Sequence, residues 1–348
     1  MLRREMPFVV ATVIRVRGSA VAKPGAKSII DAEGRPVFGW VGGGCVESFV
    51  CSAAKEALAE ASPRVVTADL EDELSGVGLP CGGVMEIFIE PVMPRRRVLV
   101  TGENDAARHA SEILERIGFA VASSASDVER DSLIMVEARA GTGLDLGGAS
   151  LAEAALSVVA EMLATVRKAS ARPLQEMKTD EPLGAFESAS ERVSQPTLVI
   201  AGHSNITEEL AWMAARVGWR VILDSTTALE ESYPEGVRIV RDDADFSQLP
   251  ASADTAVVVA THHKGDHLAI ERAVAAGAWY VGLVTSAHRS RLVRAMLEDS
   301  LHGDARLKIL RAPAGLDLGA TTPAEIALSI MCEVLACFHG RAGQNRLR

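Results

Sequence analysis

This chain of 348 residues has few aromatic residues, few cysteines and no long apolar segment. No apolar run approaches the roughly 20 residues that a bilayer-spanning helix needs, so we expect no integral membrane segment. The five cysteines are odd in number and irregularly spaced, which argues against a disulfide framework and favours a reducing compartment. The first residues carry charge but lack the apolar core of a signal peptide, so we expect a cytoplasmic protein.

Positive charge is also scarce, because 36 lysines and arginines stand against 46 acidic residues and leave a net charge of −10. A nucleic-acid partner requires a basic face, so we expect no such partner. Hydrophobic residues make up 48% of the chain and charged residues 24%, which is typical of a globular protein with an ample core. The length predicts about two or three domains.

Residues 1–94 are predicted to form an N-terminal α+β domain. Strands are expected at 8–14, 28–31 and 84–90, which are rich in β-branched residues. A helix is expected over 46–61, because apolar residues recur there at helical spacing.

The rest of the chain contains an internal repeat. Residues 97–102 and 197–202 each open a βαβ pattern, and the pattern Gly-Leu-Asp-Leu-Gly occurs at both 143–147 and 315–319. In the second copy, apolar strands alternate with helices, which indicates a parallel sheet with helices on both faces.

We therefore predict three segments after the first domain. A shortened, degenerate Rossmann-like copy occupies 95–168, a linker rich in proline, serine and charge occupies 169–196, and a full Rossmann-like domain occupies 197–340. The predicted fold class is α/β, with an N-terminal α+β domain followed by the short copy and the full parallel-sheet domain.

A glycine run before a cysteine is the most informative motif. Gly42, Gly43 and Gly44 precede Cys45, which opens the predicted helix. Glycines let a backbone approach a ligand closely, and a helix start attracts anions and favours a thiolate. Cys45 is therefore either a reactive thiol or a half-buried cysteine on a tight turn.

A second glycine-flanked cysteine, Cys81, precedes Gly82 and Gly83. It is a weaker candidate for the same chemistry. Lys23, in the loop before Pro24, is a candidate for neutralising a phosphate, and the alternative is an ordinary solvated lysine. Cys51, Cys332 and Cys337 lie within predicted helices and are expected to belong to the core.

These motifs stand in the order and spacing of a known family. The chain resembles the XdhC/CoxI proteins over about 1–92 and 197–340, and the additional short copy resembles the CoxF-like members linked to carbon monoxide dehydrogenase. The stretches that carry the resemblance are Gly18-Ser19, Lys23-Pro24-Gly25-Ala26, Gly42 to Glu47, Cys81-Gly82-Gly83, Ala201-Gly202-His203, Thr261-His262 with Asp266, Tyr280-Val281-Gly282, Pro313 to Gly319 and Thr322 to Ile330.

The resemblance implies a maturation factor that binds the molybdenum cofactor, a molybdopterin, and assists its sulfuration, protection or insertion into a molybdenum hydroxylase. The client would be of the xanthine dehydrogenase or carbon monoxide dehydrogenase type, with a cysteine desulfurase as a further partner and a homodimer as the assembly. Cys45 and Cys81 would supply the reactive thiols, with Cys45 as a molybdenum ligand. Such a protein is a cofactor chaperone rather than a turnover enzyme.

The 197–340 domain allows an alternative, which is an NAD(P)- or FAD-dependent oxidoreductase or a flavin carrier. Gly202 and His203 follow the first strand, and Asp224 ends the second, where an acid can bind a ribose hydroxyl. Ile200 stands where the family has a glycine, so we expect it to crowd a pyrophosphate. The sequence leaves NAD(P), FAD and a nucleotide-extended pterin open.

Thr261 and His262 follow the strand predicted at 255–260, at the edge where parallel sheets bind ligands. The run from His262 to His267 nearly matches a metal-binding pattern, but Lys264 replaces one histidine, and we favour a polar pocket rim.

Overall fold

The structure is a computed structural model. It describes all residues except 1–5, 19, 21, 44, 70–82, 103, 123, 125–133, 139–141, 149, 176–188, 191–192, 194, 242–245, 262–264, 301–304 and 342–348, and it leaves the side chains of residues 45, 305 and 306 undescribed. The chain divides into two compact units, Met1–Arg96 and Arg97–Arg348.

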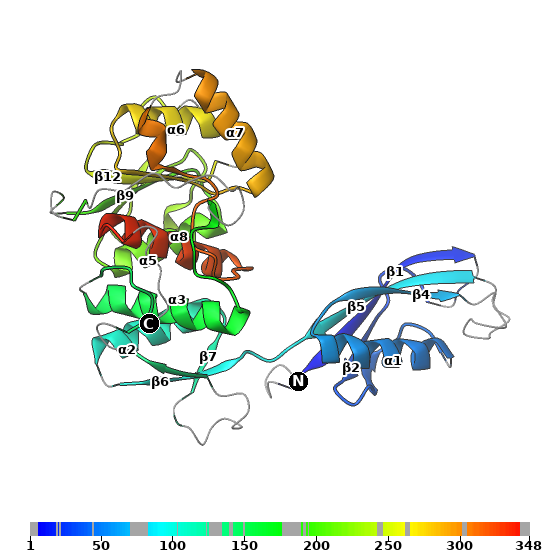
Figure 1. Cartoon of the computed structure of the whole chain (residues 1–348). Helices are drawn as coiled ribbons and strands as arrows, with labels where there is room; N and C mark the ends of the chain where they lie inside the picture. Colours follow the sequence, from blue (N-terminus) through cyan, green and yellow to red (C-terminus); the bar gives the residue numbers. More distant parts are fainter. Residues whose placement is uncertain are drawn as a thin grey trace. The chain divides into compact units, whose positions relative to one another are not determined.

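The first unit is an antiparallel sheet with a helix on one face (Figure 1). The strand order is β3-β2-β1-β5-β4. The elements are β1 (Phe8–Gly18), β2 (Lys27–Asp31), β3 (Pro36–Gly39), α1 (Cys45–Glu60), β4 (Arg64–Asp69) and β5 (Gly83–Val92).

Alternation of side chains along the strands decides which face α1 covers. Val9, Ala11 and Val13 of β1 are buried, whereas the residues between them are less covered. Val46 and Val50 of α1 join them in one core cluster. The helix therefore packs on the face of the sheet that carries these apolar residues.

The second unit contains the full Rossmann-like copy. Its six strands are all paired in parallel, in the order β11-β10-β9-β12-β13-β14. The elements are β9 (Thr197–Ala201), α5 (Asn205–Arg216), β10 (Arg220–Asp224), β11 (Arg238–Val240), β12 (Thr255–Val259), α6 (Asp266–Ala275), β13 (Tyr280–Leu283), α7 (Ala287–Ser300), β14 (Leu310–Arg311) and α8 (Pro323–Phe338), with 3₁₀ turns η4 (Glu230–Ser232) and η5 (Ala305–Ile309).

The shortened copy forms a smaller parallel sheet in the order β7-β6-β8. The elements are β6 (Arg97–Thr101), α2 (Asp105–Arg116), β7 (Ala120–Ala122), β8 (Ile134–Glu137) and α3 (Leu151–Arg167). Within this unit the helices α2 and α3 lie against α5 and α8, with one sheet on each outer side of this double layer (Figure 1).

The two copies contact each other through the equivalent arginines that end α2 and α5. Arg116 at the end of α2 pairs with Glu209 of α5, and its counterpart Arg216 pairs with Glu112 of α2. The guanidinium carbon of Arg116 also lies 4.7 Å from the centre of the Trp212 ring. The short copy therefore covers the helical face that the full domain would otherwise expose.

The caps of α3 and α8 follow the same symmetry. Glu153 closes a capping box with Ser150 and contacts the His339 Nε2 atom at 3.1 Å, just beyond the end of α8. Glu325 closes the equivalent box of α8 and accepts a 2.8 Å hydrogen bond from Arg167, at the end of α3. Each helix start is thus fastened to the end of the other helix.

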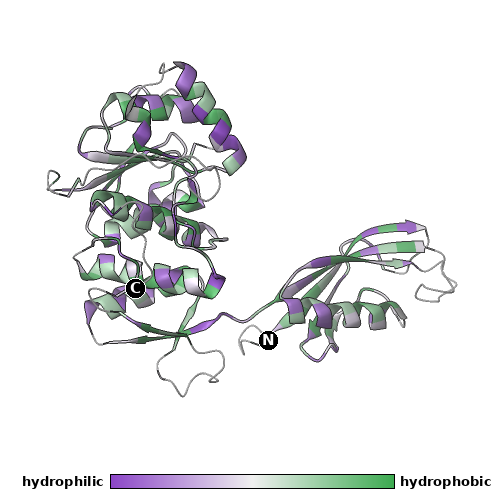
Figure 2. Cartoon of the chain, viewed as in Figure 1, coloured by the Kyte–Doolittle hydropathy of each residue, from purple (hydrophilic) through white to green (hydrophobic). Residues whose placement is uncertain are grey.

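Hydropathy follows these layers (Figure 2). The strands β9 and β12 are almost wholly apolar, because helices cover both of their faces, whereas α7 on the outside carries many hydrophilic residues. Among the helices that the structure describes, none is long and apolar enough to cross a membrane.

The predicted fold class is confirmed, and most strands lie where the sequence placed them. The sequence missed β4, which pairs along one side of β5. In the segment predicted as a linker, Ala171 donates to the Asp317 carbonyl at 2.8 Å, and Leu174 donates to the Gly315 carbonyl at 2.8 Å. This part of it is therefore bound to the full domain.

A buried carboxyl group predicts how stability depends on pH. Glu333 of α8 accepts 2.8 Å hydrogen bonds from the Tyr280 hydroxyl and from the Gly315 amide. Burial raises the pKa of Glu333 from 4.5 to about 7, although the nearby Arg311 acts in the opposite direction. The folded state therefore binds this proton more tightly, so the stabilisation is full below pH 4.5 and is lost as the pH rises through about 7.

We expect Glu333→Gln to remove this dependence, because the amide oxygen still accepts both hydrogen bonds and does not ionise. Between pH 5 and pH 8 the wild-type unit should lose up to about 3 kcal/mol more stability than the variant. Thermal unfolding of both proteins at the two pH values measures this difference. Equal pH slopes would show that Glu333 does not titrate in this range.

Candidate functional site

The glycine turn before α1 lies close to the helix that follows it. Gly42 has a φ of 147°, and a Cβ atom there would lie 2.8 Å from the Val46 Cγ1 atom. A Cβ atom at Gly43 would meet no atom within 4 Å. Cys45 is the first residue of α1. The turn is thus packed against the helix at Gly42 and open at Gly43.

The other N-terminal motifs extend from neighbouring strands. Gly83 begins β5 and is paired with Gly18 at the end of β1. The loop after Gly18 returns to β1 where the Gly25 amide donates to the Val13 carbonyl at 2.8 Å. Lys23 in this loop is exposed, which suits either a phosphate contact or simple solvation.

Several predicted site residues fall outside the described residues, namely Gly44, Cys81, Gly82 and His262, together with the Cys45 side chain. Cys332 and Cys337 are fully buried in α8, as the sequence predicts. Cys51 is partly buried and packs against the core under α1. Burial raises the pKa of the Cys51 thiol, which makes it a poor nucleophile.

The second candidate site lies at the carboxyl edge of the large sheet. The chain crosses from one side of β9 to the other between β10 and β12, so a topological switch point lies between β9 and β12. Gly202 follows β9 with a φ of 103°, and a Cβ atom there would lie 2.3 Å from the Ala260 carbonyl oxygen. Asp224 ends β10 and is only 1% exposed.

Ile200 does not line this crevice, contrary to the expected crowding. Its side chain is fully buried in the core cluster that also holds Leu210 of α5 and Leu328 of α8. The side chain is accommodated between the sheet and these helices, so it leaves the edge of the sheet unchanged.

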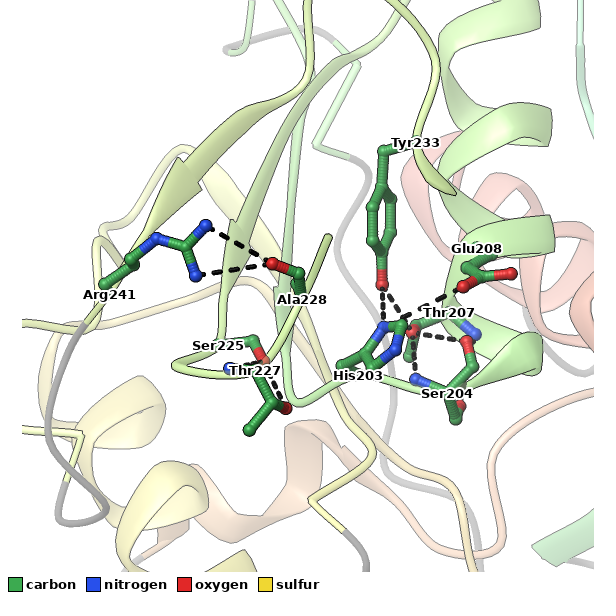
Figure 3. Close-up of polar contacts among 9 residues, drawn as sticks. All are labelled: His203, Ser204, Thr207, Glu208, Ser225, Thr227, Ala228, Tyr233 and Arg241. Atoms are coloured by element: carbon green, nitrogen blue, oxygen red, sulfur yellow. Dashed lines mark hydrogen bonds and ion pairs between the residues drawn. The ribbon is translucent and has the colours of Figure 1, made fainter. Parts of the chain in front are cut away.

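A tyrosine that the sequence did not single out joins His203 at this edge (Figure 3). The Tyr233 hydroxyl lies 2.9 Å from the His203 Nδ1 atom and 3.1 Å from the Thr207 Oγ1 atom. Burial raises the pKa of Tyr233, so its hydroxyl keeps its proton and remains available for these bonds. Glu208 lies 4.0 Å from His203.

Side chains of the capping box accept hydrogen bonds from two backbone N–H groups at the start of α5 (Figure 3). Ser204 and Thr207 form a reciprocal capping box, in which each side chain accepts the backbone N–H of the other. Ligand phosphates would thus compete with the cap for the Ser204 and Thr207 amides.

The loop after β10 is shaped by a second set of contacts. Arg241 donates from both terminal nitrogens to the Ala228 carbonyl at 3.3 Å, and the Thr227 amide donates to the Ser225 hydroxyl at 3.3 Å (Figure 3). These bonds hold the loop that follows Asp224, on the side of the sheet where a ribose would lie.

Across the switch point, Thr261 donates to Asp266, the first residue of α6. Asp266 is 3% exposed and also accepts from Arg289 of α7 at 2.9 Å. The sequence pointed to Thr261 and Asp266, which stand only five residues apart. It gave no indication that Arg289 belongs to the same network. No group of three or more metal-binding side chains occurs among the residues described.

Comparison with known proteins agrees with this arrangement. Residues 198–334 match the XdhC Rossmann domain, and residues 1–69 match the XdhC and CoxI family, so that more than half of the chain is covered. The chain belongs to the XdhC and CoxI family. Membership of this family implies an accessory role in the maturation of xanthine dehydrogenase, with that enzyme as the partner.

Two curated proteins are similar over most of this XdhC-family chain. One, from Bacillus subtilis (strain 168), is described as a probable subunit of xanthine dehydrogenase and is 25% identical, with 96% of this chain and 94% of that protein covered. The uncharacterized protein YqeB of Escherichia coli (strain K12) is 23% identical, with 94% of this chain but only 43% of that protein covered. A crystal structure of a xanthine dehydrogenase from Bacillus halodurans shares 20% identity, covering 98% of this chain and 96% of that chain, with a TM-score of 0.37.

Proposed function

We propose that this protein holds the molybdenum cofactor as cargo at the glycine turn before α1 and assists its sulfuration, protection or insertion into a molybdenum hydroxylase. The observation that carries the proposal is the position of Cys45, which opens a helix of 16 residues directly after the turn. The N–H groups of a helix start favour anions and the thiolate form of a cysteine.

The residues of the turn suit such a cargo. A thiolate is a soft ligand for a metal that is already in a sulfur-rich setting. The open side of Gly43 leaves room for a bulky group, and Gly42 keeps the turn close to the helix. The cargo would supply the reactive molybdenum centre, while the chain binds and orients it.

Native mass spectrometry of the full chain, purified from cells that synthesise the cofactor, tests this proposal. We expect a retained molybdenum–pterin mass on the wild type and on the control variant Cys51→Ser, which lies on the same helix. Cys45→Ser should lose it. Equal retention by both variants, or no retained cargo on the wild type, would remove the role assigned to Cys45.

A second candidate function is the binding of an adenine dinucleotide by the Rossmann-like domain. The observation that favours it is the almost complete burial of Asp224 at the end of the second strand, beside a switch point. An acid there accepts hydrogen bonds from a ribose and disfavours a 2′-phosphate, so NAD or FAD is preferred over NADP.

Native mass spectrometry of the same proteins and of one further variant tests this candidate independently. A dinucleotide mass should survive in Cys45→Ser and be lost in Asp224→Asn, since the two sites lie in different units. If Asp224→Asn retained the dinucleotide as well as the wild type does, the dinucleotide would not bind at Asp224.

A further inference from the structure

Among the described residues, the short copy lacks a counterpart of β11 and also lacks a block of structure after the strand equivalent to β12. In both copies, the Gly-Leu-Asp-Leu-Gly turn is closed by a serine, because the Ser157 hydroxyl donates to the Leu144 carbonyl and the Ser329 hydroxyl donates to the Leu316 carbonyl. This equivalence aligns α3 with α8 and β8 with β12. Between β12 and its turn the full copy carries α6, β13, α7 and β14, whereas only a few residues separate β8 from its turn.

In the full copy, β13 fills the space between β12 and α8. It pairs in parallel with β12, and its Leu283 carbonyl accepts a 3.0 Å hydrogen bond from the Ala314 amide. Tyr280 of β13 is fully buried, and its hydroxyl donates to Glu333 of α8 at 2.8 Å. The strand is thus held by its backbone and by one side-chain hydrogen bond.

In the short copy, the corresponding space is a groove. β8 is at the edge of its sheet within the described part of the chain, and its Met135 side chain is 64% exposed. A groove of about 310 Å³ lies between β8 and α3. Its apolar lining comes from Ile134, Met135, Val136, Val158, Met162 and Val166.

The groove keeps the acceptor that β13 uses in the full copy. Glu161 lies eight residues after the capping Glu153, as Glu333 lies eight residues after the capping Glu325. Glu161 lines the groove together with Glu137, and no basic side chain does so among the described residues. Burial raises the pKa of Glu161, as it does for Glu333.

We propose that this groove binds an extended apolar strand of a partner protein, added beside β8, with a tyrosine, lysine or arginine side chain that donates to Glu161. Edge strands are templates for such addition, in which backbone bonds give affinity and side-chain pockets give specificity. The acidic lining favours a strand that brings a hydrogen-bond donor or a positive charge. This inference concerns a protein partner and is independent of the cargo at Cys45.

The probe is a fluorescent peptide that copies residues 278–284 of this chain, made soluble by a polyethylene glycol tag. We expect it to bind the full-length protein in fluorescence polarisation. Replacing its tyrosine with phenylalanine should weaken binding about tenfold, because the hydrogen bond to Glu161 is lost. In Glu161→Leu the two peptides should bind equally, which is the signature of a direct contact in a double-mutant cycle.

Glu115→Leu, at an exposed position of α2 away from the groove, is the matched control and should keep the tenfold difference. Hydrogen exchange of the wild type should slow at β8 when the peptide is bound. The proposal fails if the peptide does not bind, if the tenfold difference persists in Glu161→Leu, or if β8 gains no protection. It also fails if the protein is a dimer that Glu161→Leu dissociates, because a second copy would then occupy the groove.

Discussion

Cys45→Ser is expected to abolish the ability of this protein to activate its client when it is co-expressed with a xanthine dehydrogenase. A serine hydroxyl is not ionised at neutral pH and is a hard ligand, so it replaces neither the nucleophile nor the soft metal ligand. We expect client activity to fall at least tenfold, to the level without the accessory protein. The measurement is the activity per client molecule, together with its molybdenum and cyanide-releasable sulfur.

The matched control is Cys51→Ser, which changes the same atom six residues further along α1. Cys51 is partly buried with a raised pKa, so its loss should change packing slightly and client activity little. Thermal unfolding of both variants verifies that α1 remains folded. If Cys45→Ser supports full activation, the thiol has no part in maturation.

Gly202→Ala is expected to destabilise the second unit strongly. The new methyl group would lie 2.3 Å from the Ala260 carbonyl oxygen, at a φ of 103° that residues other than glycine rarely adopt. Strain and overpacking together should cost about 3 kcal/mol, which lowers the melting temperature by about 6–12 °C for a unit of this size. Differential scanning calorimetry of the full chain measures the shift.

Gly236→Ala separates the two causes of this loss. Gly236 also has a positive φ, at 89°, but a Cβ atom there would meet nothing within 4 Å. Its alanine variant should therefore lose only about 1 kcal/mol and about 2–4 °C. Equal shifts for the two variants would mean that the close approach to β12 contributes nothing.

The sequence was sufficient to predict the fold class because local pattern and packing agree. Buried strands such as β9 and β12 are continuous apolar runs, and the repeated Gly-Leu-Asp-Leu-Gly turn marked the same corner of both copies. β4 was missed because the exposed Val65 is as apolar as its more covered neighbour Val66, so the alternation in burial along this short strand is not visible in the sequence.

The contacts between the two Rossmann-like copies could not be predicted from the sequence. Arg116 and Glu209 are separated by 93 residues, and neither belongs to a motif. The same holds for Tyr233, which reaches His203 only because the loop after β10 folds back over the start of α5. Such pairs depend on how elements dock, which a one-dimensional pattern does not encode.

The alkylation rate of Cys45, followed by peptide mass spectrometry, tests the central claim most directly. In cargo-free protein at neutral pH, we expect Cys45 to react much faster than Cys51, Cys332 and Cys337, two of which are fully buried. Bound molybdenum cofactor should protect Cys45 and leave the other rates unchanged. A Cys45 that reacts as slowly as the buried thiols, or equally fast with and without the cofactor, would contradict the account.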